Sequence, residues 1–329
     1  MSRAAALAVA GALLLLPAAA SAQDPAPPPA APPPPAPAPA PVVPKLALQV
    51  ERALPVGHDL VVLRKHAYRL RGTMTPAVAG QRVELAIHRN GKRIRTVRTA
   101  VRPDGTFSRR MPAGRRGRFS VRVLHAASPE LGAARGPKVS VDVVEPRAAQ
   151  GARGPLVKLL QRSLARLHYA VPINGSFDAA TGRAVMAFRK VNGMSRRYDA
   201  DRRVIETAVS GKGAFKVRHR DAGHHVEADL SRQVLALIDG DKVVATYHTS
   251  SGAPATPTVI GSYRVYLKTP GTNAKGMVHS SYFIRGYAIH GYVDVPAFNA
   301  SHGCLRVPIP DATRIFNWIR MGDRVIVYP

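Results

Sequence analysis

The chain has 329 residues, and at about 150 residues per domain this length excludes a single small domain and predicts two or three separately folded units. Lysine and arginine number 48 against 20 acidic residues, so the formal net charge is +28 and anionic partners are expected. Nucleic acid, an anionic bacterial wall and a membrane surface all satisfy this charge. A single cysteine, Cys304, excludes an internal disulfide and any metal site with several cysteine ligands.

The first residues predict export. Arg3 precedes an uninterrupted apolar run over residues 4–16, and Ala20-Ser21-Ala22 forms a small-x-small cleavage site. We therefore expect residues 1–22 to be a signal peptide and the mature protein to lie in the cell wall or at the periplasmic face of the membrane. An uncleaved anchor is the alternative, although the run is shorter than the roughly 20 residues of a spanning helix. Export disfavours nucleic acid as a partner, and aromatic residues, at 6%, do not interleave with the basic ones.

Two segments of contrasting composition follow the leader. Residues 23–45 are mostly proline and alanine, which favours an extended linker. Residues 46–147 alternate apolar and polar positions, and Asn90-Gly91 between the runs 81–89 and 93–99 indicates a hairpin. About seven such strands predict an immunoglobulin-like β-sandwich. Its outward arginines fit either a module for anionic wall polymers or a spacer with a solvated basic face.

Residues 151–212 change to a helical period. One helical face carries leucines, and Asp178 is placed as the N-cap of a second helix. The motifs Leu159-Leu160-Gln161-Arg162-Ser163-Leu164, Gly175-Ser176-Phe177-Asp178 and Ala184-Val185-Met186-Ala187-Phe188 resemble the small three-helix peptidoglycan-binding domain. This resemblance implies peptidoglycan as a partner. The segment Ser195-Arg196-Arg197-Tyr198-Asp199 departs from the Asp-Gly turn usual in that family.

Residues 213–329 return to strand patterns. The runs 226–230, 234–238 and 243–249 predict a meander. It leads to His290-Gly291 and to Ser301-His302-Gly303-Cys304-Leu305-Arg306. A free thiol beside a glycine and near two histidines indicates an activated nucleophile rather than a buried structural cysteine. No metal site is predicted, because the remaining clustered histidines lack helical i, i+4 spacing and an acidic ligand at a familiar distance: His219, His224 and His225.

These motifs, together with Asp229-Leu230-Ser231-Arg232-Gln233 and Ser250-Ser251-Gly252, resemble the L,D-transpeptidase (YkuD-type) catalytic domain. The resemblance implies a mainly β catalytic domain, and thus a multidomain chain with an all-β sandwich and a three-helix domain before it. It implies no cofactor. It also implies that carbapenem-type inhibitors acylate Cys304.

The same resemblance assigns roles within the site. Cys304 attacks the carbonyl of a peptide stem, His290 accepts the proton of the thiol, and His302 lines the site. The carbonyl of Gly291 fixes the tautomer of the imidazole. The amides of Gly303 and Cys304 hold the oxyanion, and the turn that contains them begins at Ser301. Arg306 is expected to bind a substrate carboxylate, with a structural ion pair as the alternative role. Met277, Tyr282 and Tyr292 are expected to line the cleft from the loops around His290, with packing as the alternative role.

The function implied is a peptidoglycan L,D-transpeptidase. Cys304 takes the acyl group of a donor tetrapeptide stem as a thioester and passes it to an amine acceptor, which cross-links the wall. With water as the acceptor, the same site is an L,D-carboxypeptidase; a non-catalytic wall-binding protein is the alternative from another class. Two departures from the family pattern bear on the cleft: only ten residues separate His290 from Ser301, and Arg306 stands where the family often has asparagine.

Overall fold

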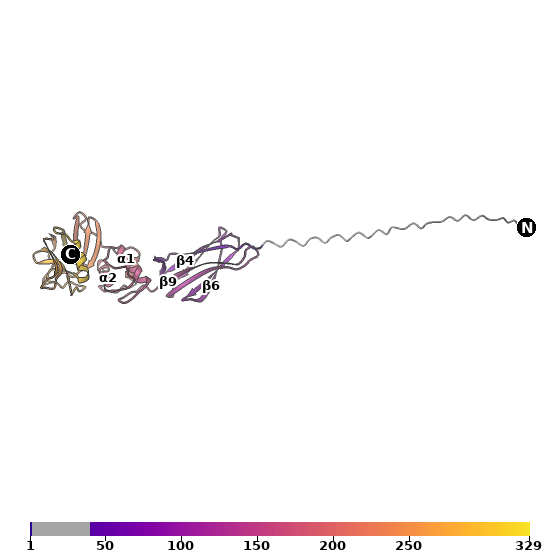
Figure 1. Cartoon of the computed structure of the whole chain (residues 1–329), viewed down its shortest axis with the longest axis horizontal. Helices are drawn as coiled ribbons and strands as arrows, with labels where there is room; N and C mark the ends of the chain where they lie inside the picture. Colours follow the sequence, from indigo (N-terminus) through magenta and orange to yellow (C-terminus); the bar gives the residue numbers. More distant parts are fainter. Residues whose placement is uncertain (2–39) are drawn as a thin grey trace, which may run out of the picture. The chain divides into compact units, whose positions relative to one another are not determined.

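The computed structural model describes Met1 and residues 40–329, and residues 41–329 form one compact unit (Figure 1). The expected signal peptide and most of the expected linker lie outside the described residues. Among the residues that are described, no helix is long and apolar enough to span a bilayer.

Residues 45–144 form a β-sandwich with nine strands instead of about seven. A three-stranded sheet has the order β1-β4-β7, and a six-stranded sheet has the order β2-β3-β9-β8-β5-β6. The predicted hairpin is β5–β6, and Asn90 and Gly91 have the positive φ values, 48° and 85°, of a two-residue hairpin turn. The strands are β1 (Lys45–Glu51), β2 (Leu54–Val56), β3 (Asp59–Leu63), β4 (Ala67–Thr75), β5 (Arg82–Arg89), β6 (Lys92–Ala100), β7 (Thr106–Pro112), β8 (Gly117–His125) and β9 (Ala134–Val144).

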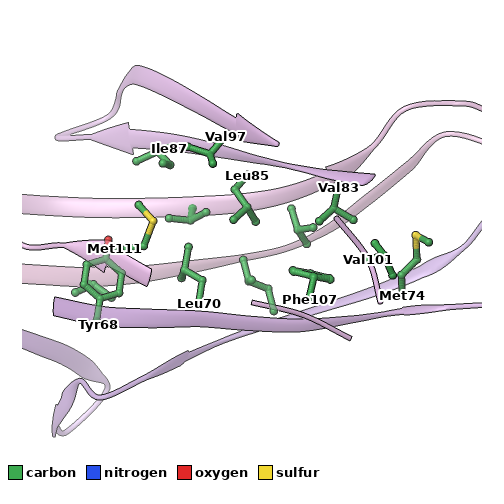
Figure 2. Packing of buried hydrophobic residues seen from close by; sticks show 14 of the residues in the cluster. Tyr68, Leu70, Met74, Val83, Leu85, Ile87, Val97, Val101, Phe107 and Met111 are labelled. Carbon is green, nitrogen blue, oxygen red and sulfur yellow. The ribbon is translucent and has the colours of Figure 1, made fainter. Parts of the chain in front are cut away.

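The core of the sandwich lies between its two sheets. Leu70 and Phe107 from the three-stranded sheet point toward Val83 and Leu85 from the six-stranded sheet, and all four side chains are buried (Figure 2). The alternation seen in the sequence is therefore the inward and outward alternation of a half-buried sheet.

Three helices follow: α1 (Pro155–Arg166), α2 (Ala179–Val191) and α3 (Arg202–Val209). Leu160 and Leu164 of the predicted apolar face are fully buried. Asp178 is the N-cap of α2 as predicted, and its carboxylate accepts a hydrogen bond of 2.8 Å from the Thr181 N–H. Asp201 caps α3 in the same way.

A buried amide ties α1 to the turn before α2. The Gln161 side chain is fully buried among the leucines. Its Nε2 donates to Asn174 Oδ1, to the Ser176 carbonyl and to Thr181 Oγ1, and its Oε1 accepts from the N–H groups of Asn174 and Gly175. Gln161 is therefore a polar part of this core, since every hydrogen-bonding group of its amide is paired.

The carboxyl-terminal domain contains two sheets and one helix. The predicted meander forms β10-β11-β12 in a five-stranded sheet of order β12-β11-β10-β18-β13, and β18 runs parallel to β10. The second sheet has the order β14-β15-β16-β17. The elements are β10 (His224–Asp229), β11 (Val234–Asp239), β12 (Lys242–His248), β13 (Gly261–Arg264), β14 (Leu267–Thr272), β15 (Val278–Ile284), β16 (Tyr287–Tyr292), β17 (Leu305–Pro308), α4 (Ile309–Trp318) and β18 (Arg324–Tyr328).

Cationic side chains of the helical domain reach into this last domain. Arg183 makes a two-pronged ion pair with Asp311, at 2.9 and 3.3 Å. Arg196, in the segment that departs from the family pattern, donates to the carbonyl of Ala297 at 2.8 Å and to that of Ser231 at 2.9 Å. At Ala297 and Asp311, these contacts attach the helical domain to the segments on either side of the Ser-His-Gly-Cys turn.

Replacing Gln161 with leucine is expected to lower the free energy of unfolding by about 2 to 3 kcal/mol, because the amides of Asn174 and Gly175 lose their buried acceptor. Urea unfolding followed by the helical circular dichroism signal measures this change. Arg166→Leu, at an exposed position of the same helix, is the control and should stay within about 0.5 kcal/mol of the parent. Equal stability of the two variants would contradict the role given to Gln161.

Candidate active site

The parallel pairing of β16 with β17 places the chemical groups on one face of a sheet. Ile289 pairs with Leu305, and both side chains are buried in the core. Because side chains alternate along a strand, His290 and Arg306, the next pair in register, point to the opposite face. Cys304 directly precedes β17 and shares that face with Arg306, two positions further on.

A tight turn from Ser301 to Cys304 fixes the thiol at the start of β17. Ser301 Oγ donates to the Cys304 carbonyl at 2.6 Å and accepts from the Gly303 N–H at 3.1 Å. Gly303 has φ +108°, and a Cβ at this position would lie 2.5 Å from the ring of Tyr287. Only glycine fits at this position, because the backbone has a positive φ and a side chain would collide with the ring of Tyr287.

Two threonines hold this turn from a neighbouring segment. Thr258 Oγ1 donates to the Gly303 carbonyl at 2.9 Å, and Thr256 Oγ1 donates to the Ser301 carbonyl at 3.0 Å. Ser250-Ser251-Gly252 is one of the motifs that resemble the L,D-transpeptidase catalytic domain. In the structure, the Ser251 carbonyl accepts from the Ser301 N–H, so this stretch also supports the turn.

The turn and the strands enclose a pocket of about 340 Å³. Seven residues expected at the site line it: Met277, His290, Tyr292, Ser301, His302, Cys304 and Arg306. Lys275, Gly286 and Tyr287 also line it and were not singled out from the sequence, because a lysine in a loop carries no pattern of its own. Tyr282 is not among the lining residues; its hydroxyl accepts a hydrogen bond from Asn273 Nδ2 at 3.5 Å.

His290 is held in one tautomer. Its ring is buried, and Nδ1 lies 2.9 Å from the carbonyl oxygen of Gly291. A carbonyl can only accept, so Nδ1 carries the proton and Nε2 is left with a free lone pair. Burial lowers the pKa of His290, the bond to Gly291 opposes this, and the charge of Arg306 lowers it further. The imidazole is therefore neutral at neutral pH.

Cys304 is also uncharged in this resting state. Burial raises the pKa of its thiol, although the Ala288 N–H and the charges of Arg306 and Lys275 favour the thiolate. The sulfur lies 3.5 Å from the Ala288 nitrogen, which donates to it, and 3.9 Å from the Gly286 carbonyl. No hydrogen bond joins Cys304 to His290 within residues 40–329. The two groups share the pocket as a neutral thiol and a neutral base.

The pocket is cationic. The guanidinium of Arg306 lies 4.2 Å above the ring of Tyr292, and its Nη1 is 3.9 Å from the largely exposed carboxylate of Asp294. Lys275 adds a second positive charge, and none of the lining residues is acidic. His302 is exposed at the rim. This field favours ligands with a carboxylate.

The other clustered histidines have structural contacts. His224 stacks on Trp318 with ring centroids 3.7 Å apart, and its Nδ1 lies 2.8 Å from Asp323. His225 is buried against Glu227, whose carboxylate also accepts from the Arg218 and His219 N–H groups. Within the described part of the chain, no three histidine, cysteine or acidic side chains are grouped as a metal site would require.

Comparison with protein families agrees with this geometry. Residues 223–327 match the model of the L,D-transpeptidase catalytic domain, YkuD, and residues 153–196 match the model of a putative peptidoglycan binding domain. The carboxyl-terminal part of the chain is thus an L,D-transpeptidase catalytic domain, preceded by a peptidoglycan-binding domain. These matches confirm the predicted family and the predicted multidomain fold class. No curated protein sequence matched the chain.

Several solved structures are similar to parts of this chain. The crystal structure of the L,D-transpeptidase from Xylanimonas cellulosilytica is 29% identical; the match covers 56% of this chain and 98% of that one, with a TM-score of 0.52. The L,D-transpeptidase from Stackebrandtia nassauensis is 21% identical over 55% of this chain and 95% of its own, with a TM-score of 0.36. The enzyme from Mycobacterium smegmatis is 13% identical over 87% and 99%, with a TM-score of 0.30.

Alkylation of Cys304 by iodoacetamide is expected to quicken as the pH rises into the alkaline range, because a raised pKa keeps the thiol protonated at neutral pH. Arg306→Gln removes a charge that favours the thiolate, so its pH profile should move to higher pH. The intact mass against time measures the alkylation rates of the parent protein and of Arg306→Gln, since the chain has one cysteine. Arg314→Gln, at an exposed position of α4, is the control. A shift of the Arg306→Gln profile to lower pH would contradict these electrostatics.

Proposed function

We propose that this protein is an exported peptidoglycan L,D-transpeptidase that works through a thioester on Cys304. The observation that carries the proposal is the shared pocket: the chain's one thiol and a buried histidine with its Nε2 unprotonated line it together with two cationic side chains. A thiol activated by a neighbouring base is a common nucleophile of acyl transfer. The family match supports the same chemistry.

In the first step a donor tetrapeptide stem is cleaved. As the Cys304 sulfur attacks the carbonyl before the terminal D-residue, the thiol proton moves to His290 Nε2. The tetrahedral oxyanion is held by the amide of Cys304 and by that of Gly303, which exchanges its 3.1 Å bond to Ser301 for the oxyanion. His290 then returns the proton to the departing amine. The terminal residue leaves and the acyl group remains on Cys304 as a thioester.

In the second step an acceptor amine attacks the thioester. His290 accepts a proton from this amine, the thiolate leaves, and the proton returns to sulfur, so the enzyme is regenerated and a cross-link between stems is formed. If water attacks instead, the product is a shortened stem and the enzyme acts as an L,D-carboxypeptidase. Both steps use the imidazole first as a base and then as an acid, which requires a pKa below or near the working pH.

Arg306 and Lys275 bind the carboxylates of the donor stem in this proposal. Arg306 is pre-oriented because it stacks on Tyr292, while its ion pair with Asp294 is long and solvent-exposed. The other segments of the chain have supporting roles. Residues 23–45 act as a linker, residues 46–147 hold the enzyme away from the membrane, and residues 151–212 bring residues 213–329 to the wall.

The proposal is tested with purified donor tetrapeptide stems and an acceptor stem. Mass spectrometry should detect the released terminal residue and a cross-linked dimer, and Cys304→Ala should yield neither. His290→Gln should lower kcat by about a hundredfold to ten-thousandfold, the loss expected for a removed general base. His279→Gln, which changes a histidine outside the pocket, is the control. Full activity of Cys304→Ala would refute the mechanism, and release without dimer would identify a carboxypeptidase.

A further inference from the structure

A second cavity lies at the contact between the helical and catalytic domains. Its volume is about 310 Å³, and it is bounded by Arg183 and Tyr198 of the helical domain and by His248, Tyr292, Val293 and Ile309 of the catalytic domain. Tyr292 also lines the pocket of Cys304, so one aromatic side chain is common to both cavities. The two cavities therefore adjoin at Tyr292.

The walls of this junction cavity are apolar and partly open. Tyr198 is 46% exposed, Val293 84% and Ile309 40%. Apolar side chains that are exposed together, with polar groups between them, are typical of a ligand site. Tyr198 lies in the segment where the sequence departs from the peptidoglycan-binding family, so this chain has its own residues at the position.

His248 presents an unpaired polar atom here. Its side chain is 2% exposed, and Nδ1 lies 3.4 Å from Lys190 Nζ, which also donates to the carbonyls of Thr249 at 2.8 Å and Gln233 at 3.1 Å. Burial lowers the pKa of Lys190 to about 6. His248 Nε2 has no hydrogen-bond partner among residues 40–329, so it is the ring nitrogen left for a ligand.

The charges of the cavity are balanced. The carboxylate of Asp311 pairs with Arg183 through Nε and Nη2, so it neutralises the charge of the guanidinium. Arg183 Nη1 takes no part in this pair and is left to donate to a ligand. Burial also holds the pKa of His248 well below its usual value, so the ring is neutral. The junction cavity thus offers an unpartnered imidazole nitrogen, a guanidinium donor and two tyrosine rings, whereas the Cys304 pocket offers two cations.

A sugar ring matches this set of groups. Its hydroxyls both donate and accept, its C–H face packs on aromatic rings, and it carries no charge. This assignment rests on the proposed function, in which the cationic pocket binds the carboxylates of the stem. The uncharged part of the same substrate then needs a separate binding site. We propose that the junction cavity binds an N-acetylated hexosamine unit of the glycan that carries the donor stem.

The test compares two donors: the bare tetrapeptide stem and the same stem attached to its disaccharide. The parent protein should use the disaccharide donor with a kcat/KM about tenfold higher, mainly through a lower KM, which corresponds to about 1.4 kcal/mol of binding. Tyr198→Ala should remove this advantage and leave the bare stem unaffected. Tyr198→Phe should keep it, and Ile173→Ala, an exposed apolar residue of the same domain, is the matched control. Equal use of both donors by the parent would overturn the proposal.

A binding experiment separates this proposal from the proposed function. An N-acetylglucosamine tetramer, which has no stem, is titrated into the full-length protein while NMR follows His248 and Val293. Both signals should shift in the parent and in Cys304→Ala, and neither should shift in Tyr198→Ala. Shifts with no turnover of either donor would refute the proposed function and keep the sugar site. No shift at His248 and Val293, or the same shift in Tyr198→Ala, would refute the sugar site.

Discussion

The site depends on one constraint, the parallel pairing of β16 with β17. This pairing puts Ile289 and Leu305 into the core and, in consequence, His290 and Arg306 onto the pocket face. Parallel neighbours need a crossover of about a dozen residues or more, and residues 293–304 alone make this one. The short spacing between the histidine and the cysteine motif is thus near the lower limit for such a connection. Ser301 and Gly303 form the turn that completes it.

Burial and positive charge act in opposite directions on the pKa of Cys304, whereas both lower the pKa of His290. Burial keeps the Cys304 thiol and the His290 imidazole neutral, while Arg306 and Lys275 favour the thiolate that forms during attack. In the proposed mechanism, the proton is transferred as the bond to carbon forms, and the cations stabilise the negative charge that results. The helical domain supports this arrangement, because Arg196 holds the crossover at Ala297 and Arg183 holds the start of α4 at Asp311.

Local patterns predicted much of this fold, and contacts between distant segments account for what they missed. Asn90-Gly91 and Asp178 act through neighbouring residues, so the hairpin and the helix cap were predictable. The number of strands was underestimated. Gln161 lay inside a leucine pattern, and its role arises from a turn more than ten residues away. Cys304 and His290 were found by motif, whereas Lys275, the bond from Thr258 to the Cys304 turn and the junction at Tyr198 become visible only when separate segments meet in space.

Whether Cys304 accepts an acyl group is read directly from the intact mass of the protein after incubation with a carbapenem. One covalent adduct per chain is expected on the unmodified protein and none on Cys304→Ala, since the chain has no other thiol. An adduct on both proteins, or no adduct on a protein shown by circular dichroism to be folded, would show that Cys304 is not the acyl acceptor.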